Sequence, residues 1–309
     1  MTQFTHYGLF FTEEHLQRAQ KNKGKAPFKA AWEFLSIPHE DTNTETLLNG
    51  YRYRLGDTQA GENAYQNVMN WLENEALHHD LSDVRLALLM GQTLELIRPH
   101  ENSTNLIRRW ADRAHHQLTS VDDNRPHAQL IKAVLQMAIG IINEDEESVN
   151  AVCGVYRDTI DNLHPEGYIT QIVEQDNEST NFDYQMQATQ SLALLAEMAK
   201  HIGIDLYSYN KRGVSVTTAC AYPLYYYFYP EKWRWSGDPK RASEGITEET
   251  AKTIFTNHIG FIEIIADHYK PPLKAIQMIL DDVRPCLDPF GGGLTTLTHA
   301  PAPRRGLFG

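Results

Sequence analysis

Residues 126–143 read PHAQLIKAVLQMAIGIIN, and the pattern of this stretch recurs along most of the chain. Apolar residues such as Leu130, Ile131 and Val134 return at spacings of three and four, which is the period of one face of an α-helix. Proline suits a first helical turn, because the amide hydrogen that it lacks would have no partner there. The stretch therefore predicts a buried helix that begins at Pro126.

The same period appears on both sides of this stretch, whereas the alternation typical of strands is almost absent. A first helical region starts after Thr12, a good N-cap, and its apolar spacing extends to Leu35. Further helices are expected at 45–55, 60–77, 82–97, 102–118, 146–162, 183–202, 210–229, 247–268 and 271–283. Long helices with short connections favour antiparallel neighbours. The predicted fold is all-α: an (α/α) toroid, meaning an incomplete α/α barrel of antiparallel helical hairpins.

A single catalytic domain is expected over residues 1–290. The 309 residues, 41% of them hydrophobic, are enough for one large helical core. The segment 230–246 is the longest loop inside this domain. Residues 291–309 are rich in glycine and proline, which predicts an extended C-terminal tail.

The net charge of −12, from 40 acidic and 28 basic residues, argues against a nucleic-acid partner, which would need a basic face. An acidic substrate would need a local basic or amide-rich groove. Cys153, Cys220 and Cys286 are far apart, so neither a disulfide framework nor a metal site is indicated, and no cofactor is expected. The sequence carries no signal for oligomeric state.

No run approaches the roughly 18 apolar residues of a membrane span, so no membrane partner is expected. The N-terminus shows no basic segment followed by an apolar one. As written, the chain is expected in the cytoplasm, or in the periplasm or outside the cell if a leader was removed.

Two helix starts hold candidate chemical groups. His127 lies next to the free backbone N–H groups at the start of its helix, where the helix dipole favours a neutral ring that can accept a proton. Asn181 or Asp183 can cap the later helix, which places Tyr184 in its first turn. A solvated histidine and a tyrosine that only anchors its helix are the alternative interpretations.

These two stretches, in this order and at this separation, resemble the alginate-lyase family of polysaccharide lyases over roughly residues 50–235. His127 matches the family histidine, Glu166-Gly167 stands where the family has an Asp-Gly turn, and Tyr184 matches the family tyrosine. The chain also departs from the family pattern.

Pro126 replaces the asparagine that precedes the family histidine, and Asn124 lies three residues before His127. The position of the family arginine falls at about Asn177. Arg125 is the nearest cation that can replace it.

The resemblance implies β-elimination on a uronic-acid-containing polysaccharide, alginate or polyglucuronate-like. The enzyme removes the proton at C5 and expels the oxygen at C4, which requires donors that neutralise the substrate carboxylate. Asn124, Arg125 and His127 are the candidate donors, and Tyr184 would protonate the leaving oxygen. Depending on which face carries the C5 hydrogen, the base would be His127 or Tyr184.

The predicted catalytic residues are thus His127, Tyr184 and Asn124, and the predicted substrate-binding residues are Arg125, Asn177, Trp233 and Trp235. The two tryptophans would stack on sugar rings from the loop after residue 230, although such aromatic clusters more often form core. Two rival functions stay open. A glycoside hydrolase would need a pair of carboxylates from Asp122, Asp123, Glu174 and Asp183. A non-catalytic glycan-binding protein would keep the groove without activity.

Overall fold

The computed structural model describes residues 2–74, 76–174, 178–233, 245–269 and 272–302. Its helices are α1 Glu13–Lys21, α2 Phe28–Leu35, α3 Thr42–Arg54, α4 Thr58–Asn74, α5 Leu81–Leu96, α6 Ser103–Ser120, α7 Pro126–Ile142, α8 Glu146–Asn162, α9 Thr170–Val173, α10 Glu178–His201, α11 Val216–Phe228, α12 Glu248–Asn257, α13 Gly260–His268, α14 Lys274–Val283 and α15 Thr295–His299. Strands β1 Asn210–Lys211 and β2 Val214–Ser215 pair antiparallel, as do β3 Leu287–Asp288 and β4 Gly293–Leu294. A short 3-10 helix covers Pro230–Lys232.

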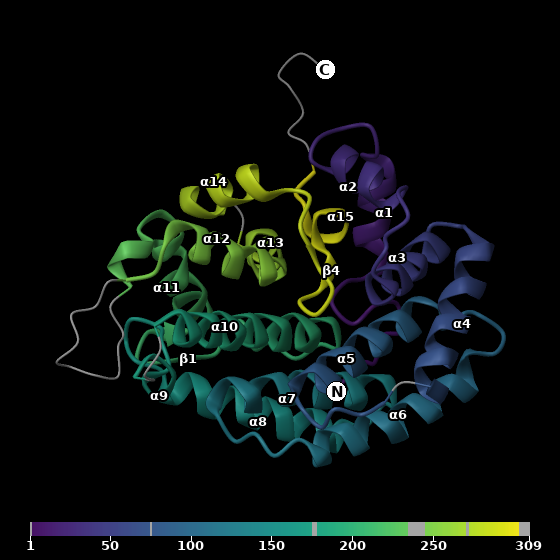
Figure 1. Ribbon diagram of the computed structural model, residues 1–309, viewed down its shortest axis with the longest axis horizontal. Helices are drawn as coiled ribbons and strands as arrows, with labels where there is room; N and C mark the ends of the chain where they lie inside the picture. Colours follow the sequence, from purple (N-terminus) through teal and green to yellow (C-terminus); the bar gives the residue numbers. More distant parts are fainter. Residues whose placement is uncertain (1, 75, 175–177, 234–244, 270–271, 303–309) are drawn as a thin grey trace.

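The helices follow a curved path, as Figure 1 shows, from α3 and α4 on the right through α6, α7 and α8 at the bottom to α10 and α11 on the left. The path continues over α12, α13 and α14 at the top. The last helix, α15, packs against α1 and α2, so that the first and last helices of the described chain meet. The fold is an incomplete (α/α) toroid, which confirms the predicted class.

Two central helices are buried on almost all sides: α7 carries mainly apolar residues, and α10 carries both apolar and polar ones. Helix α7 begins with Pro126 as predicted, and most of its residues are buried. Helix α10 is 24 residues long and packs against α7, α11 and α13. A helix with apolar residues around its whole circumference is stable only when other elements surround it. Helices α7 and α10 therefore form the centre onto which the other helices pack.

The structure corrects three predicted helix boundaries. The region 210–229 starts as a β-hairpin, because Arg212 and Gly213 both have positive φ and form the two-residue turn that joins β1 to β2. The predicted helix 247–268 is two helices separated at His258, whose side chain bonds to α10. Helix α10 starts at Glu178, so Tyr184 lies in its second turn rather than its first.

The prediction of an extended tail over 291–309 is wrong for residues 291–300. Thr295 and His299 of α15 are fully buried. The Thr296 hydroxyl donates to Glu263 at 2.6 Å and accepts from the backbone N–H of Cys286 at 2.8 Å. Glycine and proline indicated turns correctly, but the buried segment after Gly293 depends on distant partners. Residues 303–309 lie outside the described part.

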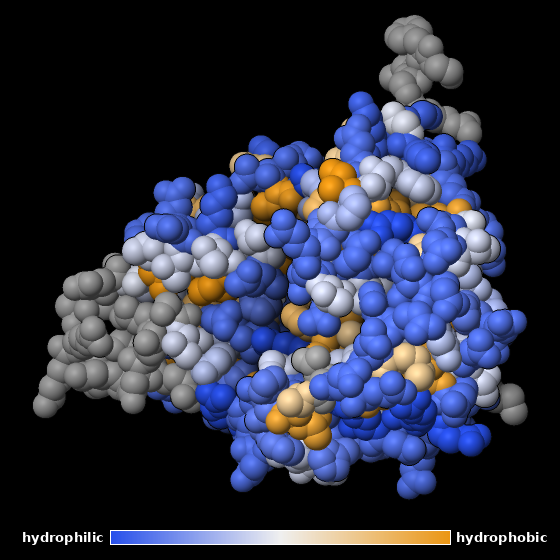
Figure 2. Space-filling view, turned by 45° about the vertical axis from the view of Figure 1, so that its right-hand side comes forward, coloured by the Kyte–Doolittle hydropathy of each residue, from blue (hydrophilic) through white to orange (hydrophobic). Residues whose placement is uncertain are grey.

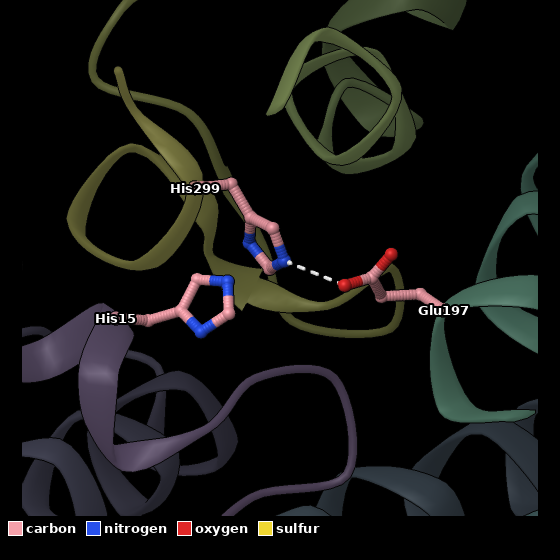
Figure 3. A group of neighbouring side chains, drawn as sticks. All are labelled: His15, Glu197 and His299. Atoms are coloured by element: carbon pink, nitrogen blue, oxygen red, sulfur yellow. Dashed lines mark ion pairs between the residues drawn. The ribbon is translucent and has the colours of Figure 1, made fainter. Parts of the chain in front are cut away.

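A cluster around Glu197 joins the first and last helices to α10, and Figure 3 draws Glu197 with His15 and His299. Glu197 of α10 lies 2.9 Å from His201 Nε2 and 3.6 Å from His299 Nε2 of α15, and it accepts hydrogen bonds from Lys200 and Tyr207 at 2.8 Å each. Burial raises the pKa of Glu197, but the two histidines outweigh burial and hold it well below its usual range. The cluster therefore contains a charged carboxylate in the core.

His15 of α1 completes the cluster, and these three groups have the spacing of metal ligands. However, the Thr12 N–H donates to His15 Nδ1 at 3.1 Å, which leaves the ring proton on Nε2. Lys200 also occupies the Glu197 oxygen that a metal would need. These contacts favour a hydrogen-bonded cluster that ties α1, α10 and α15 together over a metal site.

The face shown in Figure 2 is mostly hydrophilic and is hollowed near its centre. None of the helices in the described part of the chain is long and apolar enough to span a membrane. All three cysteines are buried.

Candidate active site

The two helix starts singled out by the sequence meet in space. His127 is the second residue of α7, and Tyr184 lies in the second turn of α10. Their rings stack face to face, with centroids 3.7 Å apart and planes 10° from parallel. The structure therefore brings together two residues that are more than fifty positions apart, as the sequence predicted.

Burial distinguishes the two rings. His127 is 1% exposed, and its Nε2 is buried without a hydrogen-bond partner among the described residues. Tyr184 is only partly buried and covers the histidine. Of the stacked pair, Tyr184 is therefore the ring on the solvent side.

The charge state of His127 follows from its surroundings. Burial lowers the pKa of His127 to about 4, and the positive charges of Arg125 and Arg85 act in the same direction. The ring is therefore neutral near neutral pH, as its place at a helix N-terminus predicted.

Arg125 connects the two helix starts. Its Nη1 donates a hydrogen bond to the Tyr184 phenolic oxygen at 2.6 Å. Its other donors hold Asp123, with Nε 3.0 Å from Oδ1 and Nη2 2.6 Å from Oδ2. The hydrogen bond and charge of Arg125 lower the pKa of Asp123 to about 2, so this ion pair persists over the physiological range. Arg125 thus fixes the position of the Tyr184 oxygen and places a positive charge beside it.

A cavity of about 430 Å³ is lined by Asp183, the residue before Tyr184. The charges of Asp183 and Arg85, which both line it, act on His127, so the cavity lies near the stacked pair. Arg85 of α5, His258 between α12 and α13, and Asp288 of β3 also line it. Cavities of this size hold small ligands in other proteins.

A chain of hydrogen bonds runs along the cavity wall. Asp183 Oδ1 lies 2.8 Å from His258 Nε2, and His258 Nδ1 lies 3.2 Å from Gln190 Oε1. The Gln190 amide in turn donates to Asp288. Burial raises the pKa of Asp183, but the hydrogen bond and charge of His258 outweigh it and keep the pKa below its usual range. Burial raises the pKa of Asp288.

Sequence reasoning missed Arg85 as a site residue. It stands between Val84 and Leu86 on a helix whose other residues from 84 to 91 are apolar. A single charge within such a run is the signal that was available, since buried arginines normally have a partner or a function. The same reasoning missed His258, which sits in the break between two helices that the sequence presents as one.

The other predicted residues have different outcomes. Asn124 is exposed, and its amide bonds to Asp122 and Gln129 rather than to the stacked pair. The prediction that Trp233 stacks on sugars is wrong: the residue is 0% exposed and donates to Asn181 at 2.7 Å. Asn177 and Trp235 lie outside the described residues.

The turn that the sequence matched to the family's Asp-Gly turn is Glu166-Gly167. Gly167 has a φ of +104°, and a β-carbon there would lie 2.3 Å from the carbonyl oxygen of Thr218. Glycine is required at this position because the turn packs directly on α11. The turn thus orders the segment before α10.

The site offers a positioned tyrosine, a neutral histidine and two arginines beside a cavity large enough for a sugar. The His15, Glu197 and His299 cluster is separate from it. Glu197 lies thirteen residues along α10 from Tyr184, which is about 20 Å at the helical rise. Proton transfer assisted by fixed cations is the chemistry that these groups support.

The family model described as alginate lyase matches residues 78–233, about half of the chain. The protein is therefore a polysaccharide lyase. The chain belongs to the alginate lyase family. No curated protein sequence matches it.

Solved structures share the fold. A variant of alginate lyase A1-III complexed with a tetrasaccharide has a TM-score of 0.72 and 14% identity over 98% of both chains. Alginate lyase A1-III from Sphingomonas species A1 has a TM-score of 0.65 and 18% identity, over 84% of this chain and 76% of that one. An alginate lyase from Bacteroides ovatus has a TM-score of 0.62 and 11% identity, over 84% and 73%. At these identities the likeness shows the fold alone.

Proposed function

We propose that this polysaccharide lyase cleaves a polymer of D-mannuronate, as in alginate, or of D-glucuronate, and that Tyr184 carries the proton transfers. The observation that carries this proposal is the Arg125–Tyr184–His127 arrangement. Arg125 donates to the phenolic oxygen, and His127 supports the ring from behind. The solved relative bound to a tetrasaccharide is consistent with a saccharide ligand.

In the proposed reaction the phenolic oxygen of Tyr184 first accepts a proton and then donates it. Deprotonated Tyr184 takes the proton from C5, and the electrons of that C–H bond form the double bond between C4 and C5. The bond from C4 to the glycosidic oxygen breaks, and this oxygen takes the proton back from Tyr184. Arg125 stabilises the negative charge on the phenolic oxygen at the start of the cycle, because its N–H is already 2.6 Å away.

His127 has a positioning role in this proposal. Its Nε2 is buried and its ring is covered by Tyr184, so it does not face the cavity. A neutral ring at van der Waals distance fixes the plane of the tyrosine without adding a charge that would compete with Arg125. This favours Tyr184 over His127 as the base.

The use of one oxygen restricts the stereochemistry of the substrate. In β-D-mannuronate and β-D-glucuronate the C5 hydrogen and the C4 oxygen lie on the same side of the sugar, so one group reaches both. In α-L-guluronate they lie on opposite sides, which would require a second group across the ring. The geometry of the site therefore supports mannuronate or glucuronate linkages.

The test is to incubate the protein with polymannuronate, polyglucuronate and polyguluronate and to follow the ultraviolet absorbance of the new double bond. We expect absorbance to rise with polymannuronate or polyglucuronate and to stay at background with polyguluronate. Cleavage of polyguluronate at a comparable rate would overturn the single-tyrosine mechanism. Release of reducing ends without absorbance would instead favour a hydrolase.

A further inference from the structure

Arg85 lies in the wall of the cavity and is partly buried. Its guanidinium makes no hydrogen bond or ion pair with any described residue. Burial lowers the pKa of Arg85, while the charges of Asp183 and Asp288 raise it. A guanidinium stays charged in such surroundings. A partly buried charge without a partner is unfavourable in free energy, so we expect Arg85 to bind an anionic ligand.

The acids around Arg85 are already satisfied by other groups. Asp183 accepts hydrogen bonds from His258 at 2.8 Å and from Gln187 at 2.6 Å. Asp288 accepts from the Gln190 amide and from the backbone N–H of Gly260. The negative charge of the two acids favours the charged guanidinium of Arg85 without occupying its donors.

The second arginine of the site is not available in this way. Arg125 is held by both oxygens of Asp123 and by the Tyr184 oxygen, so three of its donors are occupied. The charge of Arg125 is already compensated by Asp123, whose carboxyl is ionised down to a pH of about 2, so Arg125 attracts a substrate carboxylate less than an uncompensated arginine would. The two arginines therefore have separate tasks.

We propose that Arg85 binds the carboxylate of the uronate residue that is cleaved and neutralises it as the C5 proton leaves. This inference rests on the proposed function, because it assigns the cation that β-elimination requires. Arg85 lines the cavity together with Asp183, and the charges of both act on His127, the ring that stacks on Tyr184. In this proposal a uronate bound at the cavity has its carboxylate on Arg85 and its C5 toward Tyr184. A planar guanidinium fork matches both oxygens of a carboxylate.

The proposal assigns to Arg85 the role for which the sequence analysis named Asn124, Arg125 and His127 as candidates. The expected position of the family arginine falls outside the described residues, at Asn177, which is uncharged. In this chain the charge comes from a different helix, α5.

The first measurement is kinetic and uses the polymer that the wild type cleaves fastest. Arg85→Ala should lower kcat/KM by about 10²–10³-fold, the cost of removing one preorganised donor to the developing charge. Arg85→Lys should recover part of this loss, because it restores the charge without the fork. The matched control is Arg109→Ala on α6, which removes an arginine paired with Glu73 and should leave kcat/KM unchanged. Circular dichroism and the thermal midpoint establish that each variant is folded.

The second measurement is binding, in the Tyr184→Phe background, by calorimetry. The two ligands are a tetrasaccharide of the same uronate and its carboxyl-reduced, neutral form. Adding Arg85→Ala should weaken binding of the acidic tetrasaccharide by about 10–100-fold, as for a charge-assisted hydrogen bond, and leave binding of the neutral one within about twofold. Equal weakening for both ligands would mean that Arg85 only shapes the cavity, and would overturn the proposal.

The inference and the proposed function fail in different ways. If Arg85→Ala keeps kcat/KM within about threefold while Tyr184→Phe is inactive, the lyase mechanism stands and the role of Arg85 is refuted. If the wild type itself cleaves no polyuronate, the proposed function is refuted and the inference falls with it.

Discussion

At the scale of single residues, Tyr184 is the group on which the account depends. Tyr184→Phe removes the hydroxyl and keeps the ring that packs on His127. We expect kcat to fall by about 10²–10⁴-fold with little change in stability or substrate binding. The measurement is the initial rate of double-bond formation, with the thermal midpoint as the control. Near-normal turnover in this variant would exclude Tyr184 as the proton-transfer group.

His127 provides a second prediction at this scale. His127→Phe keeps a flat ring beneath Tyr184 but cannot transfer a proton, so it should keep activity within about tenfold of the wild type. His127→Ala leaves a void there and should lower kcat by about 10²-fold through misplacement of the tyrosine. If His127→Phe is as inactive as Tyr184→Phe, the histidine exchanges protons itself and the positioning role is wrong.

At the scale of secondary-structure elements, the Glu197 cluster joins helices from the beginning, the middle and the end of the chain. Glu197→Gln removes a buried charge that His201, His299 and Lys200 surround. We expect a loss of about 3 kcal/mol in the free energy of unfolding, because buried cations lose their counter-charge. The measurement is urea denaturation. Asp161→Asn, at an exposed pair with Lys211, is the control and should leave the midpoint nearly unchanged. An equally stable Glu197→Gln variant would show that the cluster does not hold the ends together.

The helices themselves were predictable from the sequence because their period is local. Pro126 and the apolar run after it fixed α7, and His127 therefore fell at the helix start where the structure has it. The break at His258 was not predictable, because it depends on a hydrogen bond to Asp183 across 75 positions. The buried position of Trp233 similarly depends on Asn181. The place of Arg85 in the cavity wall was not predictable either, because it depends on which side of α5 faces the cavity in the folded protein.

At the scale of the whole molecule, burial of histidines makes stability depend on pH. Burial holds the pKa of His15 and of His127 at about 4 in the folded protein, against about 6.5 for an unfolded chain. Between these values the unfolded chain binds protons that the folded chain does not. The free energy of unfolding should therefore fall as the pH drops from about 6.5 to 4.

His127→Phe isolates one part of this effect. Between pH 7 and pH 5 the wild type should lose about 2 kcal/mol more than the variant, since the variant no longer has this titrating group. Urea denaturation at the two pH values measures the difference. Equal losses in both proteins would mean that His127 is protonated in the folded state, contrary to its neutral assignment.

The net charge of −12 is unfavourable for binding a polyanion, but positive side chains at the site offset it locally. Arg125 places one positive charge at the Tyr184 oxygen, and Arg85 places another in the cavity wall. The Debye length is about 8 Å in physiological salt, and exposed charges farther away than this are screened. The acidic surface therefore acts only weakly on a sugar that is already in the cavity. The local pair of arginines then decides the sign of the field that the substrate meets.

The most direct test of the central claim is mass spectrometry of the products formed from polymannuronate or polyglucuronate. β-Elimination through Tyr184 adds no water, so we predict products with an unsaturated non-reducing end, each lighter by one water than the corresponding saturated oligosaccharide, and we predict that Tyr184→Phe forms none of them. Saturated products, heavier by one water, would show hydrolysis and would contradict the account.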